Sequence, residues 1–373
     1  MPGMDSALAP TLERVRAAIA DRTPLRIRGG GTKDFHGGRP LAGEVLDTRA
    51  LSGIVSYEPS ELVVTALAGT PLAELEALLA AQGQCLPFEP PHFGEGATVG
   101  GMVAAGLSGP ARASVGAVRD YVLGVEIVNG RAELLRFGGQ VMKNVAGYDV
   151  SRLMAGSWGT LGLITEVSLK VLPVAPAEAT LRFECTQAEA LARLNAWGGQ
   201  PLPLNASCWV NETGEAGGNG GQGTLYLRLR GAIAAVQAAC RTLGGERLDA
   251  AAVAPDWAAS REQTLPWFAA RPATHALWRL SVPDTAPVLG LPPGVGDPLV
   301  EWHGALRWVQ APADAGPALR QAAAAVGSSA TLFRAASAQL ERAGGPFDSK
   351  YPALAAIEAR LRQAFDPHGI FQS

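Results

Sequence analysis

Leu25–Lys33 reads LRIRGGGTK, and this stretch decides how the rest of the sequence is interpreted. A short apolar strand runs directly into three consecutive glycines at 29–31. Because glycine has no Cβ, the successive backbone N–H groups stay uncovered and can form a nest for a phosphate or pyrophosphate. Thr32 and Lys33 add side-chain donors. An ordinary tight turn also explains the glycines, so this loop alone leaves the ligand open.

A second run of small residues, Gly96–Gly109, reads GATVGGMVAAGLSG. Thr98 stands where an N-cap would begin a helix, and the amides at a helix N-terminus attract an anion. One helix terminus contributes only about 0.3–1 kcal/mol for each favourable charge, so several amides must converge on the ligand. Two separate nests suit a diphosphate better than one, although close helix packing through glycine also accounts for this composition.

The third glycine cluster, Gly156–Gly162, precedes a predicted strand at 163–171. A Rossmann fingerprint needs its glycines after a strand and before a helix, and here the order is reversed. The sequence also contains no G-x-x-x-x-G-K-[ST] motif. We therefore exclude a Rossmann NAD site and a P-loop NTPase.

Composition narrows the functional classes further. The chain has 373 residues, of which 47% are hydrophobic, and its net charge is −3. This length predicts about two or three domains, and the balanced charge argues against nucleic acid as a partner. Four cysteines and five histidines are scattered without metal-ligand spacing, so we expect no metal site in this chain. We expect a cytoplasmic protein without direct membrane insertion.

The spacing of apolar residues predicts an α+β fold in two parts. The proline-rich stretch Pro173–Pro176 marks the predicted boundary, after an N-terminal part of two α+β subdomains at about 1–68 and 69–174. Residues 175–345 are expected to form an antiparallel sheet with helices on one face. Residues 346–373 are expected to form a C-terminal helix and tail.

Several motifs carry a resemblance to a known family. The N-terminal part resembles the PCMH-type FAD-binding fold of the vanillyl-alcohol-oxidase superfamily. More narrowly, the chain is similar to the FAD-binding subunits of bacterial glycolate oxidases, and the block from Lys143 to Glu166 is the most specific part of this likeness. The stretches that carry it are Arg28–Lys33, Ala97–Gly101, Ser108–Gly109, Gly116–Gly124, Lys143–Leu153, Gly159–Glu166, Leu277–Leu280, Gly304–Trp308 and Phe365–Phe371.

The resemblance implies that FAD lies between the two N-terminal subdomains, with its diphosphate on backbone amides, and that the C-terminal tail returns to this domain. In covalent relatives a histidine follows the paired glycines of the first loop, and Thr32 occupies that place here. We therefore expect non-covalent FAD. The residues that the resemblance assigns to FAD are Arg28, Gly29, Gly30, Gly31, Thr32, Lys33, Ala97, Thr98, Val99, Gly100, Gly101, Ser108, Gly109, Gly116, Asp120, Gly162 and Ile164.

Oxidation of a 2-hydroxy acid requires a base for the hydroxyl proton and an anchor for the carboxylate. If 301–308 is one strand, alternation places His303 and Arg307 on the same face, as base and anchor. Arg279 is a second candidate anchor. A half-buried histidine and sheet-surface arginines are the simpler interpretation of these three residues. Lys143 and Tyr148 could also face the flavin or have structural roles.

The resemblance implies oxidation of glycolate to glyoxylate, with electrons passing through the flavin to an iron–sulfur subunit. It also implies a second, catalytic flavoprotein subunit, and partners that could hold the complex at the inner face of a membrane. A self-sufficient D-lactate or other 2-hydroxy-acid dehydrogenase remains an alternative. So does a non-catalytic assembly subunit with a structural FAD site. Gln372 departs from the family pattern, which has asparagine there, and could replace a flavin contact.

Overall fold

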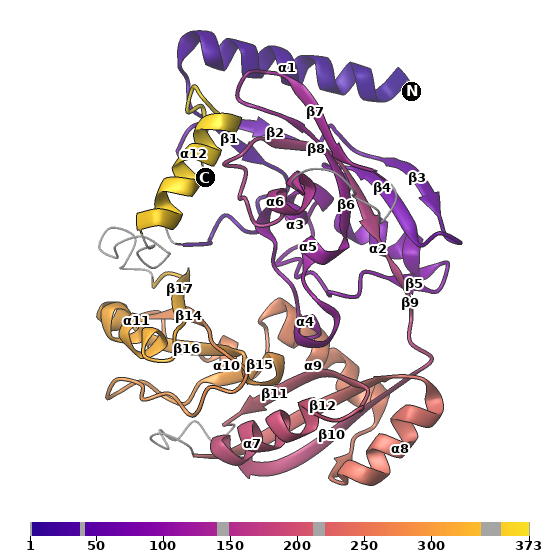
Figure 1. Cartoon of the computed structure of the whole chain (residues 1–373), viewed down its shortest axis with the longest axis vertical. Coiled ribbons are helices and arrows are strands. Elements are labelled where there is room, and N and C mark those ends of the chain that lie inside the picture. The colour runs from indigo at the N-terminus through magenta and orange to yellow at the C-terminus, as the bar shows by residue number, and fades with distance from the viewer. Residues whose placement is uncertain (1, 38–41, 140–148, 212–220, 337–351, 373) are drawn as a thin grey trace.

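The computed structural model describes residues 2–37, 42–139, 149–211, 221–336 and 352–372. The molecule has two lobes, one above the other in Figure 1. The upper lobe combines the N-terminal part of the chain with the C-terminal helix, and the lower lobe is built around one large sheet. Lys143 and Tyr148 lie outside the described residues.

The upper lobe contains two principal sheets. The three-stranded sheet has the order β18-β1-β2 and is parallel, and the five-stranded sheet has the order β3-β4-β8-β6-β7 and is antiparallel. A separate pair is formed by β5 (Gln84–Cys85) and β9 (Leu172–Pro173). The strands of the two sheets are β1 (Leu25–Arg28), β2 (Glu44–Asp47), β3 (Ile54–Glu58), β4 (Val63–Leu67), β6 (Val122–Val128), β7 (Leu134–Gly138), β8 (Leu163–Lys170) and β18 (Phe371–Gln372).

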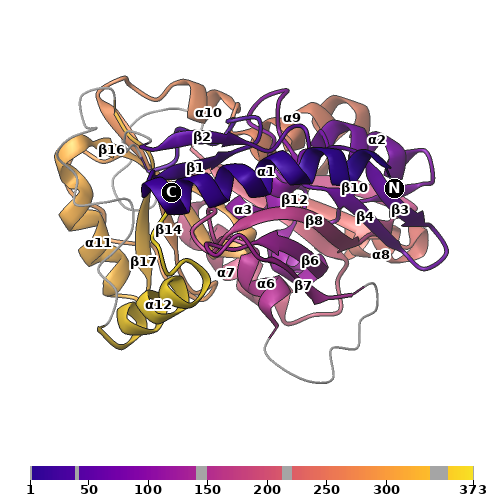
Figure 2. The same cartoon turned by 90° about the horizontal axis from the view of Figure 1, so that it is seen from above.

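The five-stranded sheet forms the centre of the upper core. Every residue of β6 is buried, as is all of β8 except Lys170, which explains their nearly continuous apolar sequences. Leu72, Leu75 and Leu79 pack one face of a helix onto this core. The long N-terminal helix runs across the top of the molecule (Figure 2). The helices of this lobe are α1 (Pro2–Asp21), α2 (Leu72–Ala80), α3 (Val99–Ala105), α4 (Arg112–Val115), α5 (Val118–Tyr121), α6 (Val150–Met154) and α12 (Pro352–Phe365).

The lower lobe contains an eight-stranded antiparallel sheet in the order β13-β10-β12-β11-β15-β16-β14-β17. Its first strand in the chain begins at Ala177, directly after the stretch Pro173–Pro176. The strands are β10 (Ala177–Thr186), β11 (Leu204–Val210), β12 (Gln222–Gly231), β13 (Glu246–Arg247), β14 (His275–Ser281), β15 (Leu299–Glu301), β16 (Leu306–Pro312) and β17 (Ser329–Arg334). The helices are α7 (Gln187–Gly198), α8 (Ile233–Leu243), α9 (Ala250–Glu262), α10 (Pro266–Ala269), α11 (Gly316–Ala324), and the 3-10 turns η1 (Trp302–Gly304) and η2 (Ala313–Ala315).

Helices cover both faces of this sheet. Leu227 and Leu229 of β12 point to one face of the sheet, where they pack with α7 and α8. On the other face, Cys208 and Trp308 pack with α9 and α10. The expectation of helices on one face is therefore incomplete. The unexpected helix α9 contains Pro255 in its interior, and proline ordinarily ends a helical pattern.

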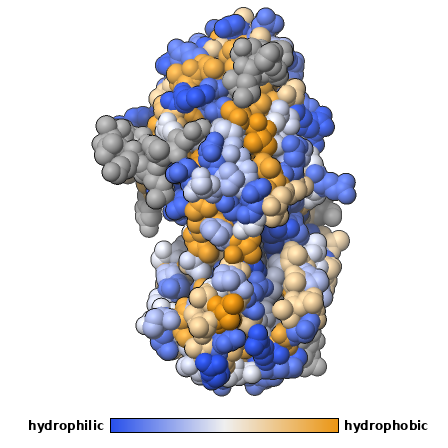
Figure 3. Space-filling view, turned by 90° about the vertical axis from the view of Figure 1, so that its right-hand side faces the viewer, coloured by the Kyte–Doolittle hydropathy of each residue, from blue (hydrophilic) through white to orange (hydrophobic). Residues whose placement is uncertain are grey.

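Direct contacts join the two lobes at the waist that Figure 3 shows in space-filling form. Arg228 on β12 places Nη2 2.7 Å from each carboxylate oxygen of Glu89. The indole nitrogen of Trp302 donates to the carbonyl of Gly109 at 3.0 Å. These bonds fix the lower sheet against the loops of the upper lobe. Among the described residues, none of the helices has both the length and the apolar character needed to cross a bilayer.

Candidate functional site

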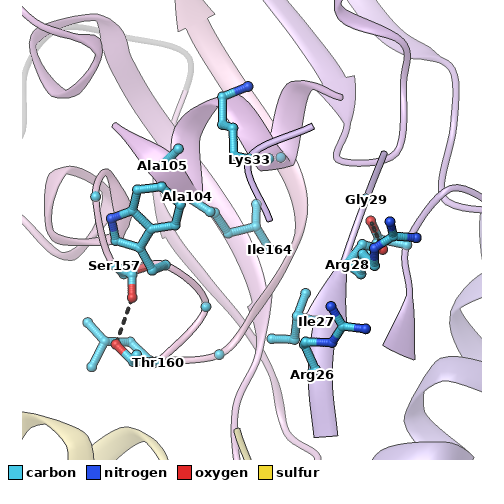
Figure 4. A pocket seen from close by; sticks show the side chains of 18 of the residues that line it. Arg26, Ile27, Arg28, Gly29, Lys33, Ala104, Ala105, Ser157, Thr160 and Ile164 are labelled. Carbon is cyan, nitrogen blue, oxygen red and sulfur yellow. Dashed lines mark hydrogen bonds between the residues drawn. The ribbon is translucent and has the colours of Figure 1, made fainter. Parts of the chain in front are cut away.

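A cavity of about 650 Å³ lies in the upper lobe, where the loop after β1 meets α3 and the turn before β8. Ligand sites in proteins commonly occupy about 300–1,000 Å³. Figure 4 shows Arg26, Ile27, Arg28 and Gly29 on one side of it and the Ser157–Thr160 turn on the other. The cavity therefore lies between segments that are far apart in the sequence.

The glycines of the two loops permit a very close approach of backbone to backbone. A Cβ on Gly30 would lie 1.5 Å from the carbonyl oxygen of Gly96, and one on Gly29 would lie 2.4 Å from Oγ1 of Thr98. A Cβ on Gly100 would lie 2.6 Å from that of Ala68. Only glycine fits at these three positions, and the amides of both loops thus line one cradle.

Thr98 begins α3 as the sequence predicts. Its Oγ1 accepts a hydrogen bond from the amide of Gly101 at 3.2 Å, which is the N-cap geometry, and the prediction of a cap is confirmed. Gly106 ends the helix in the left-handed conformation with φ of 63°. The short helix therefore holds Gly100 and Gly101 at the cavity wall.

The charged lining of the cavity is predominantly cationic. Its basic residues are Arg26, Arg28, Lys33 and Arg362, and its acidic residues are Asp34 and Glu358. The Asp34 carboxylate pairs with Arg26 at 3.5 Å and with Arg28 at 2.8 Å. Burial lowers the pKa of Lys33 to about 8, because it disfavours the charged form, while Glu262 acts in the opposite direction. This balance suits a ligand that carries negative charge.

The Ser157–Thr160 turn was not predicted as part of the site. Trp158 has φ of 52° and its indole stacks on His36, with the ring centroids 4.2 Å apart. Thr160 Oγ1 donates to the Ser157 carbonyl at 2.7 Å, which closes the turn. The sequence signal was the glycine cluster Gly156–Gly162, from which the resemblance assigned only Gly162 to FAD and left out 157–160.

The C-terminal segment also contributes to the cavity. Glu358, Leu361 and Arg362 of α12 line it, and so does Gln372 of β18. Gln372 reaches this position because β18 pairs in parallel with β1. The residue at which the chain departs from the family pattern therefore lines this cavity, and its side-chain Nε2 donates to Gly369 O at 3.3 Å.

The structure divides the predicted FAD residues into two sets. Those in the first loop, together with Thr98, Gly100, Gly101, Gly162 and Ile164, line the cavity. The others lie outside its lining and have local partners: Asp120 Oδ2 accepts from Ala117 N at 2.8 Å, and Ser108 Oγ accepts from Val118 N at 3.2 Å. The residues outside the lining are Ala97, Val99, Ser108, Gly109, Gly116 and Asp120.

The expectation that His303 and Arg307 share one strand face is wrong. His303 lies in the 3-10 turn η1 with φ of 53°, so strand alternation does not apply to it. Its ring nitrogens lie 2.8 Å from Ser114 Oγ and 3.1 Å from Ser207 Oγ. Burial lowers the pKa of His303 to about 4. Neither His303 nor Arg307 lines the cavity.

The three catalytic candidates are also separated across the lower sheet. Arg279 lies opposite Trp308 in the β14–β16 ladder, whereas Arg307 lies opposite Leu280, so the two arginines project from different faces. Arg307 is buried, its Nη2 donates to Ala286 O at 3.2 Å, and Nε and Nη1 have no partner in the described part of the chain. Arg279 lies over the Trp302 ring, 4.9 Å from its centroid.

Arg279 instead belongs, with His36 and Arg334, to a group of basic residues at the junction of the lobes, here called the junction group. Burial, followed by the charges of Arg279 and Arg334, lowers the pKa of His36 to about 4, so its imidazole is neutral at pH 7. His36 also pairs with Arg334 as an isolated β-bridge and lines the cavity of the upper lobe. Among described residues, no three His, Cys, Asp or Glu side chains are grouped to hold a metal.

Comparisons with known proteins agree with this geometry. A family model described as "FAD binding domain" matches residues 11–138. Over almost the whole chain the fold resembles that of an alkyldihydroxyacetonephosphate synthase, with a TM-score of 0.64 at 15% identity, covering 96% of this chain and 73% of that one. This likeness concerns the fold alone.

Three curated relatives give closer matches. Glycolate oxidase subunit GlcD of Bacillus subtilis is 31% identical over 48% of this chain and 39% of its own length. D-lactate dehydrogenase of Archaeoglobus fulgidus is 36% identical over 40% of this chain and 33% of its own. Glycolate oxidase subunit GlcE of Escherichia coli is 46% identical over 96% of this chain and 94% of its own length. The chain therefore belongs to the GlcE family of glycolate oxidase subunits, FAD-linked oxidoreductase proteins with a PCMH-type FAD-binding domain.

Proposed function

We propose that this chain is the FAD-carrying subunit of a complex that oxidises glycolate to glyoxylate. The observation that carries the proposal is the match to GlcE over almost the whole of both chains. The partners would be a catalytic flavoprotein subunit and an iron–sulfur subunit, through which the complex could be held at the inner face of the membrane. This chain would contribute a flavin site to a shared electron path.

The volume of the cavity and its donor groups support it as the FAD site. The backbone amides of Gly29, Gly30 and Gly100 line a cradle that would bind the diphosphate. A Cβ on any of these three glycines would collide with a neighbouring atom. Lys33 and Arg28 add positive charge beside it. When bound, FAD supplies the group that accepts the two electrons removed from a 2-hydroxy acid. These features support both loops as the diphosphate site.

The residue at position 32 supports non-covalent binding. Thr32 lines the cavity in the place where covalent relatives have histidine. Threonine lacks the ring nitrogen through which that histidine bonds the flavin. His36 is the histidine of the cavity wall, but it is stacked on Trp158. We expect acid precipitation to release all the flavin into solution. Flavin that remains with the precipitated protein would contradict this part of the proposal.

In the alternative of a self-sufficient dehydrogenase, the junction group of His36, Arg279 and Arg334 would hold a 2-hydroxy acid against the flavin. The guanidinium groups of Arg279 and Arg334 stay cationic at pH 7, since burial lowers each pKa only to about 10. They would bind the carboxylate, and the neutral imidazole of His36 would accept the hydroxyl proton. His303 and Arg307, the base and the carboxylate anchor expected from the sequence, do not line this cavity.

The decisive experiment is the visible absorption spectrum of the purified chain before and after anaerobic addition of glycolate. We expect bound FAD that stays oxidised when the chain is alone and bleaches when the partner subunits are added. Bleaching by the chain alone would favour a self-sufficient dehydrogenase. A colourless chain that restores activity to the complex would favour an assembly role, and either result would overturn the proposed division of labour.

A further inference from the structure

The lower lobe contains a second cavity that is separate from the FAD cavity. Its volume is about 640 Å³, and its lining has no residue in common with the first. It lies between the sheet face that carries Cys208 and Leu299 and the two helices α9 and α10. A concave site of this size can enclose a small organic ligand.

Aromatic side chains form much of the wall, and two of them are fixed in place. Trp257 donates from its indole nitrogen to Thr180 Oγ1 at 2.9 Å. Trp267 packs edge-on against Phe268 at 5.1 Å, and its carbonyl accepts from Gln310 Nε2 at 2.5 Å. Tyr226 from β12 completes the aromatic lining. The wall is therefore preformed, which reduces the ordering that binding would require.

The charge of this lining is opposite to that of the FAD cavity. Asp256 and Asp297 are its acidic residues, and none of its lining residues is lysine or arginine. Asp297 Oδ2 accepts from Asn211 Nδ2 at 2.8 Å, which holds the carboxylate at the wall. Carboxylates beside aromatic rings attract a cation and repel an anion such as glycolate.

We propose that this second cavity binds a small organic cation, a protonated or quaternary amine with apolar substituents. The rings of Trp267 and Tyr226 contact its apolar groups, and Asp297 with Asp256 balances its charge. This site is independent of the proposed glycolate oxidation, because the inference uses neither the FAD cavity nor its residues.

The test is calorimetric titration of the FAD-loaded chain with choline. The comparison ligand is its uncharged isostere, in which carbon replaces the quaternary nitrogen. We expect saturable binding of choline and at least about tenfold weaker binding of the isostere. The isostere lacks the positive charge that the carboxylates and aromatic rings attract. Equal binding of the two ligands, or no binding of choline, would overturn the proposal.

Two variants locate the binding within the molecule. Asp297→Asn keeps an acceptor for Asn211 and is expected to weaken choline binding about fivefold or more. Asp314→Asn, an exposed change in the same lobe outside both cavities, is the matched control and should leave binding unchanged. If Asp297→Asn lowers the folded fraction, the exposed Asp256→Asn serves instead. Unchanged affinity in a folded carboxylate variant contradicts the assignment.

Discussion

Gly30 shows how one residue can determine whether two loops meet at the cavity of the upper lobe. A Cβ there would meet the carbonyl oxygen of Gly96 at 1.5 Å, which no rotation can relieve because both groups belong to the backbone. We predict that Gly30→Ala separates the two loops, at a cost of about 3 kcal/mol, and lowers the flavin content of the purified chain at least tenfold. The ratio of flavin absorption to protein absorption measures this.

A matched glycine change controls for the loss of flexibility. Gly198 ends α7, and an added Cβ there has nothing within 4 Å. Gly198→Ala should therefore leave both stability and flavin content at their original values. Full flavin loading of Gly30→Ala would show that the loops do not form the diphosphate site.

Lys33 gives the same site a pH dependence. Its pKa is about 8, so its positive charge is present at pH 7 and mostly lost at pH 9.5. We predict that FAD affinity for the apoprotein falls about fivefold across this interval, because a charge-assisted contact to the diphosphate is lost. Lys33→Met should bind FAD more weakly at pH 7 and show a flat profile, which equilibrium fluorescence titration can measure.

The stability of the apoprotein should respond in the opposite direction. The ordinary lysine pKa is 10.5, so between pH 8 and 10.5 the unfolded chain binds more protons at Lys33 than the folded chain does. The contribution of Lys33 to the free energy of unfolding therefore rises with pH in this window. Parallel loss of affinity and of stability above pH 8 would mean that general unfolding, and not Lys33, causes the change in binding.

At the scale of elements, the sequence predicts what depends on local pattern. The apolar spacing from Ile233 to Leu243 predicts a helix over these residues, and α8 has the same bounds. The expected strand through His303 fails, since two residues with positive φ, Trp302 and His303, turn the chain between β15 and β16. Gly304, with φ of 102°, continues the turn and is its one glycine, whereas Trp302 and His303 are residue types that give no signal for a positive φ.

Local sequence pattern also predicts only part of the lining of the upper cavity. The two glycine loops could be identified because their composition is unusual on its own. Arg362 and Gln372 line the cavity because α12 and β18 return to β1, where Leu25 pairs with Phe371. Trp158 lines it from the turn before β8 and stacks on His36, which is also distant in the sequence. Local periodicity does not encode these contacts.

Asp366 is the residue that holds the last strand in place. Its carboxylate accepts from the amides of Ile370 and Phe371, at 3.1 Å and 2.8 Å. We predict that Asp366→Ala destabilises the fold by about 2–3 kcal/mol and speeds FAD release, because both buried amides lose their partner. Asp366→Asn keeps one acceptor and should cost about half as much. Chemical denaturation and flavin dissociation rates measure the two effects.

These two variants distinguish a local from a general effect. If Asp366→Ala loses stability but its FAD release rate is unchanged, then β18 does not support the cofactor cavity. An Asn variant as damaging as the Ala variant would mean that the negative charge, and not the accepted hydrogen bonds, is the important property.

At the scale of the whole molecule, one buried ion pair joins the two lobes. The Arg228 side chain is only 3% exposed, and its guanidinium contacts both oxygens of Glu89, which Arg230 also approaches at 3.1 Å. The Arg228 side chain also donates to Asn205 Oδ1 at 2.7 Å. Removal of the carboxylate charge would leave Arg228 buried and uncompensated, so the pair controls how the lower sheet sits on the FAD-binding lobe.

We predict that Glu89→Gln lowers the free energy of unfolding by about 3–5 kcal/mol, the cost of leaving a buried charge unpaired. Asp47→Asn is the control, because it removes an equally short but exposed pair with Arg49 and should cost less than about 1 kcal/mol. Thermal and urea unfolding compare the two. If the lobes unfold in one transition in the original chain and in two in Glu89→Gln, this pair couples them. Equal small losses in both variants would place the coupling in the aromatic contacts of the junction, where Phe333 meets Phe35 at 5.7 Å.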